Sequence, residues 1–454
     1  MKIKTVDTVL PLHQVNYIVM MLIPVSFLFL AVMIPDVSYC QQDTNQPPNG
    51  SQLFTMPLES VSLLDAAATP DSIPERKLAF NEADFGFTTA RVGMAFMNDW
   101  AWYSQDEPGK AQMDSAGVEL KDVSQVRDVR FLLNGKINSS REIIWKIAVM
   151  YDGVERGWAF RETGLLIGLP ELSGKVFLGR SKEGYSFNKV QNGFSTLGIE
   201  RQPSLDLISI MQDGIRFFGD VKGPDLFWSI GAYTNLIYGQ SKFMIYEWTY
   251  SGRVGWLPIY HKEENEVLHL GVNFRYAKPA NGTITAKSRP ESNPAPYFIN
   301  TGAFETDQES SIGWEAYYFK GPLMLGSEGN VHNFSSAQVG DPQFFGANAT
   351  ISYNLTGESY PYVKDNAASF FIDPINSVFD KGWGAWQLLL TGSVFNTNDG
   401  LKPGGNFWKV TSVASWFLSY NFTMKFSYGY GVLDRFHLEG ATHFFQTRLQ
   451  FQLL

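Results

Sequence analysis

Met424-Lys425-Phe426-Ser427-Tyr428-Gly429-Tyr430-Gly431-Val432, near the end of the chain, carries a large apolar side chain at every second position. The last segment, Phe445-Gln446-Thr447-Arg448-Leu449-Gln450-Phe451-Gln452-Leu453, repeats the alternation with Gln and Arg on its second face. Successive side chains of a strand point to opposite faces, so each strand has one apolar and one hydrated face. Because the pattern recurs along most of the chain, it predicts a transmembrane antiparallel β-barrel, with a soluble all-β protein as the alternative.

The same alternation extends upstream through many segments. Residues 143–149 and 347–355 alternate, and in residues 268–276 every apolar side chain faces away from His269 and Asn273. About sixteen such segments follow one another from residue 85 onward, and single-chain bacterial barrels have an even number of strands. A count roughly two strands lower or higher stays open, because strand boundaries read from a sequence shift by a few residues.

Two longer polar stretches interrupt the predicted strands. Residues 278–311 contain several Pro and Asn, and residues 359–382 have few periodic apolar positions. Outer-membrane barrels have short turns at the periplasmic end and longer loops at the extracellular end. We therefore expect both stretches to be extracellular loops.

The composition supports a barrel and excludes several other classes. Aromatic residues make up 15% of the 454 positions, charged residues 18%, and the mean hydropathy of -0.13 is too low for a helical membrane protein. The net charge of -9 argues against a nucleic-acid partner. Cys40 is the only cysteine, so the chain has no intramolecular disulfide and no Cys-based zinc site.

The N-terminal region resembles a secretory signal. Lys2 and Lys4 precede an apolar run at 17–32, and small residues lie near Cys40. We expect residues 1–40 to be a removed signal peptide, with a retained membrane anchor as the alternative. Residues 41–84, rich in Gln, Pro, Ser and Ala, are expected to form a flexible or partly helical periplasmic leader, and residues 85–454 the barrel domain.

Several blocks of the sequence resemble the phosphate-selective porin O and P family. The strongest is residues 353–358 (YNLTGE), followed after a loop by residues 382–388 (GWGAWQL). Residues 252–258 and 179–186 match in the family's order, as do Arg127 and Arg130 ahead of Leu133-Asn134-Gly135. The resemblance implies a 16-stranded barrel in the outer membrane of a Gram-negative-type bacterium, associated as a homotrimer. It also implies passive diffusion of small anions such as phosphate.

An oxyanion path needs donors that replace part of the hydration shell, and the planar fork of Arg contacts two oxygens at once. Alternation or the matching blocks place the anion-path candidates in the lumen: Arg180, Lys182, Arg130, Lys146, Arg275, Lys189 and Arg201. Arg180 and Lys182 precede residues 184–203, a candidate inward-folded loop. The alternative for each residue is a solvated lumen wall, in which Arg and Lys pair with Asp and Glu.

Two other functions remain beside the soluble all-β alternative. A general porin for small hydrophilic solutes fits the charge balance, and a barrel enzyme is a further option, although no Ser/His or Asp/His motif is visible. The sequence shows neither metal-ligand spacing among its six His nor a nucleotide-binding loop, so we expect no cofactor, no metal and no enzymatic activity. Lipid of the outer membrane is the expected surrounding.

Overall fold

The computed structural model describes residues 79–221, 223–237, 245–364 and 371–453. The expected signal peptide (1–40) and most of the expected leader (41–84) lie outside the described residues. The first strand, β1 (Glu82–Asp84), falls inside the leader range and pairs with the start of β2 (Thr89–Gln105), so the sheet begins slightly before residue 85. None of the described helices has the length and apolar character needed to cross a membrane.

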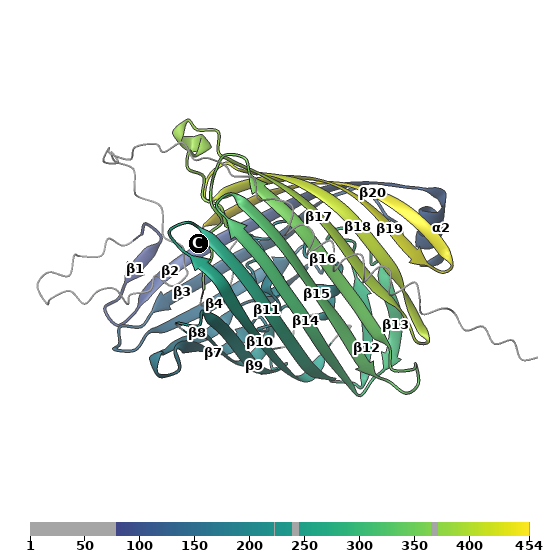
Figure 1. The fold of residues 1–454 in the computed structure, drawn as a ribbon, viewed down its shortest axis with the longest axis horizontal. Helices are drawn as coiled ribbons and strands as arrows, with labels where there is room; N and C mark the ends of the chain where they lie inside the picture. The colour runs from purple at the N-terminus through teal and green to yellow at the C-terminus, as the bar shows by residue number, and fades with distance from the viewer. Residues whose placement is uncertain (1–78, 222, 238–244, 365–370, 454) are drawn as a thin grey trace, which may run out of the picture. The chain divides into compact units, whose positions relative to one another are not determined.

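An antiparallel sheet closes on itself through hydrogen bonds between β2 and the last strand (Figure 1). The ring has 16 strand positions, as the alternation predicted, because β5 and β6 pair with successive parts of β4 and fill one position. After β2, the strands are β3 (Val123–Lys136), β4 (Ile143–Asp152), β5 (Gly157–Phe160), β6 (Thr163–Leu169), β7 (Gly174–Ser181), β8 (Gln212–Val221), β9 (Leu226–Thr234), β10 (Tyr246–His261), β11 (Glu266–Pro279), β14 (Gln308–Lys320), β15 (Leu323–Ser335), β16 (Gln343–Asn354), β17 (Ala385–Asp399), β18 (Lys402–Phe417), β19 (Phe422–Arg435) and β20 (Leu438–Leu453).

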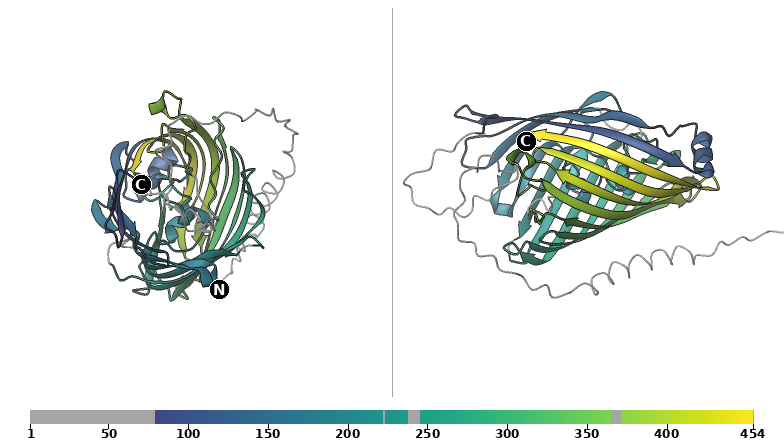
Figure 2. Two further views of the ribbon diagram at one scale, coloured as in Figure 1. Left: turned by 90° about the vertical axis from the view of Figure 1, so that its left-hand side faces the viewer. Right: turned by 90° about the horizontal axis from the view of Figure 1, so that it is seen from above.

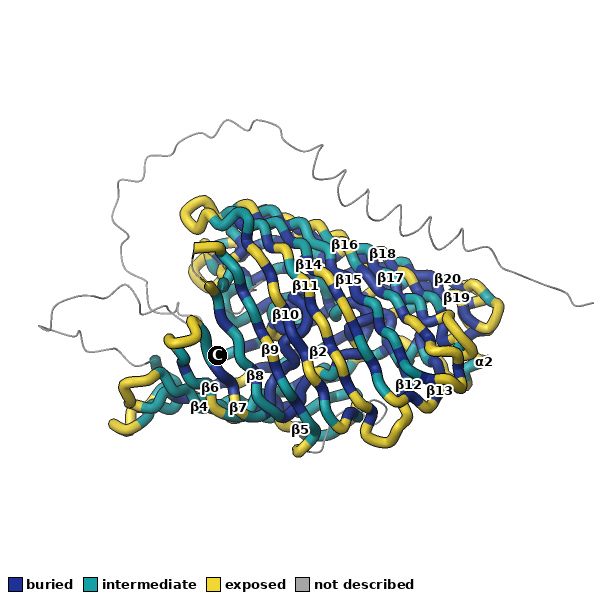
Figure 3. The backbone as a smooth tube through the Cα atoms, turned by 60° about the horizontal axis from the view of Figure 1, so that its bottom comes forward, coloured by how far each residue is buried: buried dark blue, intermediate teal, exposed yellow. Residues whose placement is uncertain are grey.

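The alternation of the sequence becomes the two faces of the wall. In β11, Val272 and Phe274 point outward and are about half exposed, whereas His269, Asn273 and Arg275 are buried in the lumen. Figure 3 shows how buried and exposed positions alternate along the strands while the turns at both ends are exposed. Closing the sheet also removes the free strand edges, which a membrane does not tolerate.

The two long polar stretches lie at opposite ends of the barrel, so the expectation that both are extracellular is wrong. The loop after β11 shares its end with the helix α2 (Glu107–Ser115), whereas the loop after β16 shares the end of the C-terminus (Figure 1). Three strands, β14 to β16, separate the two loops, and an odd number of antiparallel strands brings the chain to the other end. Sequence reasoning assigned both loops by length without counting the strands between them.

Three segments turn into the ring, as the end-on view in Figure 2 shows. The inner loop, residues 182–211, joins β7 to β8 and contains α3 (Phe187–Val190) and η3 (Pro203–Leu207). The hairpin of β12 (Thr283–Ser288) and β13 (Ile299–Glu305) lies within the loop after β11. Residues 358–364, after β16, form the third segment, while η2 (Pro170–Leu172) and η4 (Val378–Asp380) belong to loops at the strand ends.

Aromatic side chains of the wall pack against these segments. Phe298 of the hairpin packs on Phe407 and Phe444, with ring centroids 5.5 and 5.8 Å apart. Phe187 of the inner loop stacks on Tyr317 at 4.1 Å. Because these clusters lie along β9 to β20, they fill that side of the lumen and leave the space along β3 to β5.

Candidate lumen site

Cations of the lumen hold the inner loop by its backbone carbonyls. Lys182 Nζ donates to the carbonyl oxygens of Val190 and Gln191 (3.2 and 2.5 Å), and Lys425 of β19 donates to Gly198 O at 3.0 Å. The candidate inward-folded loop at 184–203 is thus confirmed as an inward fold. A buried ammonium bonded to several carbonyls satisfies groups of the loop backbone that would otherwise be buried without partners.

Arg180 and Lys182, the two leading anion-path candidates, both have partners within the protein. Arg180 Nη1 lies 2.9 Å from Asp213 Oδ1, and its Nε donates to Phe160 O. Burial lowers the pKa of Lys182 to about 7, so this lysine is partly neutral at pH 7.

Arg275 and Lys189 are also engaged. Arg275 is fully buried between Glu183 (2.8 Å) and Glu309 (2.7 Å). Lys189 Nζ donates to Leu205 O at 2.8 Å, and burial lowers its pKa to about 7. Their clearest contacts therefore fasten the inner loop to itself and to the wall.

Arg130 of β3, Lys146 of β4 and Arg201 of the inner loop are partly buried. Arg130 Nη2 pairs with Asp128 at 2.6 Å, and its guanidinium lies over the ring of Phe194. Lys146 has no ion-pair or hydrogen-bond partner for its ammonium among the described residues. Arg201 donates to the carbonyls of Asn188 and Gln191, both at 2.7 Å, and forms no ion pair within the described part of the chain.

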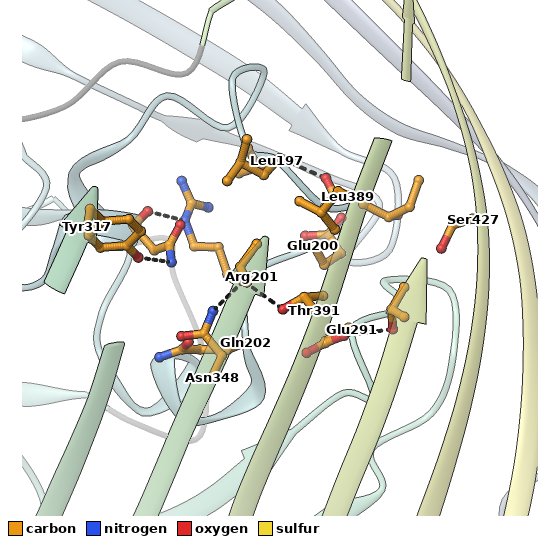
Figure 4. A pocket seen from close by; sticks show the side chains of 16 residues that line it. Leu197, Glu200, Arg201, Gln202, Glu291, Tyr317, Asn348, Leu389, Thr391 and Ser427 are labelled. Carbon is orange, nitrogen blue, oxygen red and sulfur yellow. Dashed lines mark hydrogen bonds between the residues drawn. The ribbon is translucent and has the colours of Figure 1, made fainter. Parts of the chain in front are cut away.

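Two cavities meet at the inner loop, and both are lined by Glu200, Arg201 and Glu291. The first lies between the loop and the β14–β19 wall and is rich in hydroxyl and amide groups, including Thr391 and Asn348 (Figure 4). The second, of about 300 Å³, lies between the inner loop, the hairpin tip and the β3–β5 wall. The three shared side chains mark the place where the lumen is divided.

Arg161 lines the larger cavity and was missed by the sequence reasoning. Its guanidinium forms neither a hydrogen bond nor an ion pair with any described residue, although the residue is only 8% exposed. It lies at a β-bulge: three residues from Arg161 to Thr163 stand opposite two residues of β4. Bulges re-aim side chains in this way. Trp158 and Phe160 alternate on the outer face, and this alternation places residues 159 and 161 in the lumen. The pattern could therefore have identified Arg161 from the sequence.

Arg127 and Arg289 complete the basic lining and were not among the predicted site residues either. Arg127 pairs with Glu200 at 3.0 Å, and Arg289 of the hairpin tip lies over the Tyr297 ring at 4.3 Å. Burial alone would raise the pKa of Glu200, but the charges of Arg127 and Arg448 lower it well below its usual range. The Glu200 carboxylate is therefore ionised, and the guanidinium groups of Arg127 and Arg448 balance its charge.

The sequence profile of the family described as "Phosphate-selective porin O and P" matches residues 109–453. The chain belongs to this family. It is therefore an outer-membrane β-barrel porin of the Gram-negative type and not an enzyme, as the sequence blocks predicted. No curated protein matches the porin significantly.

Several solved outer-membrane channels are similar to this chain at low sequence identity. The OmpF of Salmonella typhi, in a complex with daunomycin, is 10% identical with a TM-score of 0.51, covering 82% of this chain and all of that one. An anion-selective porin from Comamonas acidovorans is 10% identical with a TM-score of 0.47, covering 80% of this chain and 100% of that one. The DcaP channel of Acinetobacter baumannii is 10% identical with a TM-score of 0.49, covering 82% and 99%.

Proposed function

We propose that this porin conducts small anions, phosphate among them, by passive diffusion along the β3–β5 side of the lumen. The observation that carries the proposal is Arg161, a cation without a partner among the described residues, which faces a cavity of about 300 Å³. The cavity lies between the two inward segments, so a solute crossing the barrel on this side passes the Arg161 guanidinium.

The charges around this cavity differ in how far they are already neutralised. Glu200 is paired with Arg127 and Arg448, and Glu291 lies 3.8 Å from Lys409. Arg161 and Arg201, in contrast, form no ion pair with a described residue. An anion entering the cavity therefore meets two guanidinium groups without a counter-charge among the described residues, and it meets the carboxylates of Glu200 and Glu291, which have one. Glu155 and Asp206 also line the cavity and form no ion pair with a described residue.

Guanidinium groups in series suit a phosphate-like solute. Each planar fork can contact two oxygens of the anion, and several modest sites allow release where one tight site would trap the solute. We propose Arg161, Arg201 and Arg130 as successive contacts, with Lys146 as a further charge on the β4 wall. Arg180, Lys182, Arg275 and Lys189 act in this scheme by fixing the inner loop.

The test is single-channel recording in planar bilayers, with a chloride reversal potential and a phosphate titration, on the porin and on Arg161→Ala. We expect an anion-selective current that phosphate reduces, and a loss of both properties in the variant. Arg141→Ala, at an exposed turn, removes the same charge outside the lumen and serves as the control. Cation preference in the unmodified porin, or selectivity that survives Arg161→Ala, would refute the proposal.

A general porin for small hydrophilic solutes is the second candidate, and the hydroxyl-rich cavity of Figure 4 favours it. Thr350 and Thr391 hydrogen-bond to each other at 2.8 Å beside Asn348, which is a lining suited to neutral polar solutes. Liposome swelling with small sugars distinguishes the two functions: swelling rates that depend on solute size alone favour the general porin.

We also propose that the porin works as a homotrimer in outer-membrane lipid after removal of residues 1–40. Ala349, Gly392, Ser412 and Ala414 are small residues at outward-facing positions of β16 to β18. Ser412 and Ala414 lie in a hollow of the outer face that is also lined by Leu388, Leu390 and Phe426. Side chains of another barrel wall can enter such a hollow. Native mass spectrometry in detergent would test the proposal by showing three copies or one.

A further inference from the structure

An apolar lobe, residues 375–384, projects at the C-terminal end of the barrel between β16 and β17. Ile375, Phe379 and Trp383 are 68, 65 and 84% exposed. The lobe includes η4, drawn as the short green helix outside the barrel wall in Figure 1. Large apolar side chains gathered on one small element mark a contact surface more often than isolated ones do.

The lobe is fixed by hydrogen bonds. Val378 N donates to Leu418 O at 2.8 Å, which ties the lobe to the end of β18. Gly384 N donates to Asn376 O at 2.9 Å and closes the lobe at its base. The Ser377 hydroxyl accepts from Phe379 N at 3.1 Å and caps the short helix. The apolar side chains are therefore held outward by an ordered backbone.

The lobe continues the lipid-facing side of the barrel. Trp416 Nε1, on β18, donates to Trp383 O at 2.8 Å, and the Phe379 ring lies 5.7 Å from that of Phe422 on β19. Trp416 itself stacks on Trp386 of β17, with ring centroids 5.2 Å apart, just beyond the outward-facing Leu388. An unbroken apolar surface thus runs from the strand wall to the lobe.

Another turn at the same end has the opposite character. The β10–β11 turn carries Lys262, Glu263 and Glu264, all exposed. Charged side chains of this kind remain in water. Exposed apolar side chains also occur elsewhere at this end, at Phe85, Phe87 and Leu172, so the turns of this end differ from one another in character.

We propose that the lobe is a membrane-interface anchor that inserts Ile375, Phe379 and Trp383 into the phospholipid head-group region beside β17 to β19. Trp383 is favoured at this depth because its indole is apolar in body and carries a polar N–H, and Ile375 and Phe379 add apolar area beside it. Lys381, in the same lobe, supplies a cation at the level of the lipid phosphates. The anchor extends the lipid-contacting surface beyond the ends of the strands on one side of the barrel.

The test places an environment-sensitive nitrobenzoxadiazole label on single cysteines at 379 or 383. Cys40 is the only native cysteine, so Cys40→Ser with Phe379→Cys or Trp383→Cys gives one labelling site. Glu263→Cys, on the charged turn at the same end, is the matched control. The full-length porin is reconstituted in phosphatidylethanolamine–phosphatidylglycerol vesicles, with and without brominated acyl chains, and unchanged conductance confirms folding.

We expect the labels at 379 and 383 to emit at shorter wavelength than the label at 263 and to be quenched several-fold more by brominated lipid. Emission equal to that of the control would place the lobe in water and overturn the proposal. Short-wavelength emission without quenching by lipid would show that protein, such as a second copy of the chain, covers the lobe, which also overturns it. No outcome depends on which ion the porin conducts.

Discussion

The two sides of the lumen wall are built from different residues. Along β2 to β5 the lumen-facing positions include Ala95, Ala148 and Ala159, with Arg161 free of partners within the described residues. Along β14 to β20 the corresponding positions carry aromatic rings, among them Phe319, Phe344, Phe395, Phe407 and Phe444, all buried. Small residues leave space for solute, whereas aromatic residues fill the lumen and hold the inward segments.

Charges follow the same division. On the filled side, Arg253 bonds Glu315 with both Nε and Nη2, and Arg275 is fully enclosed between Glu183 and Glu309. A buried ion pair of this kind is costly to separate, because either partner alone would remain charged and unsolvated. Such pairs do not exchange a partner for a passing anion. A porin can therefore carry many lumen cations and still offer only a few of them to the solute.

The largest effect on conductance is expected from filling the open side of the lumen. Ala159→Trp places an indole in the cavity that Arg161 lines, and we expect single-channel conductance to fall by the largest factor of any variant here. Val272→Trp adds the same ring to an outward-facing position of β11 and should leave conductance unchanged. Recording both variants in planar bilayers is the measurement. Equal conductance in the two would show that the solute path does not follow β3 to β5.

Removing an aromatic ring from the filled side should lower the stability of the barrel and also loosen the β12–β13 hairpin. Phe407→Ala removes the ring that packs on Phe298 and Phe444, and a deletion of this type costs about 3–5 kcal/mol of unfolding free energy. We expect a looser β12–β13 hairpin and a noisier, larger current. The outcome is measured by urea unfolding in detergent together with channel recording.

The neighbouring residue supplies the control for that variant. Trp408 lies on the opposite face of β18, where it points outward and is 39% exposed. Trp408→Ala should leave the current quiet, because no inward segment packs against it. A similar increase in noise from both variants would argue against a specific role of the lumen aromatics.

The strand pattern was readable from the sequence because each strand obeys a local rule. Residues 424–432 alternate as written, and β19 shows the two faces that this implies. The inward fold of residues 184–203 was predicted because this long segment follows a block that matches the family. The pairing of Arg180 with Asp213 was not readable, since the two residues are far apart in the chain and meet only when β7 pairs with β8. The same applies to Arg161, whose lack of a partner is a property of the whole lumen.

The ion selectivity should depend on pH because two of the anchoring cations, Lys182 and Lys189, titrate near neutral pH. Burial lowers the pKa of Lys182 and Lys189 to about 7, so both gain charge as the pH falls through that value. We expect the preference for anions to rise from pH 8 to pH 6 and to become flatter in Lys182→Met with Lys189→Met. Reversal potentials across this range are the measurement, and a flat profile in the unmodified porin would contradict the prediction.

The lowered pKa values of Lys182 and Lys189 also determine the direction in which the stability of the porin changes with pH. The folded pKa of each lysine lies below its unfolded value near 10.4, so the unfolded chain binds more protons between those values. Stability should therefore increase as the pH rises from about 7 toward 10, and the double variant should lose this slope. Urea midpoints at several pH values test it, and a falling midpoint would show that the carbonyl contacts depend on the charged ammonium.

The smallest effect is expected for an ion pair outside the lumen. Arg141 Nη2 lies 2.5 Å from Glu171 Oε1, but their side chains are 42 and 60% exposed at turns of the C-terminal end. Water and salt screen such a pair, so its net contribution to stability is slight whatever its geometry. Arg141→Ala should shift neither the urea midpoint nor the reversal potential measurably. A change in selectivity comparable to that of Arg161→Ala would mean that turn charges, and not the lumen wall, set the ion preference.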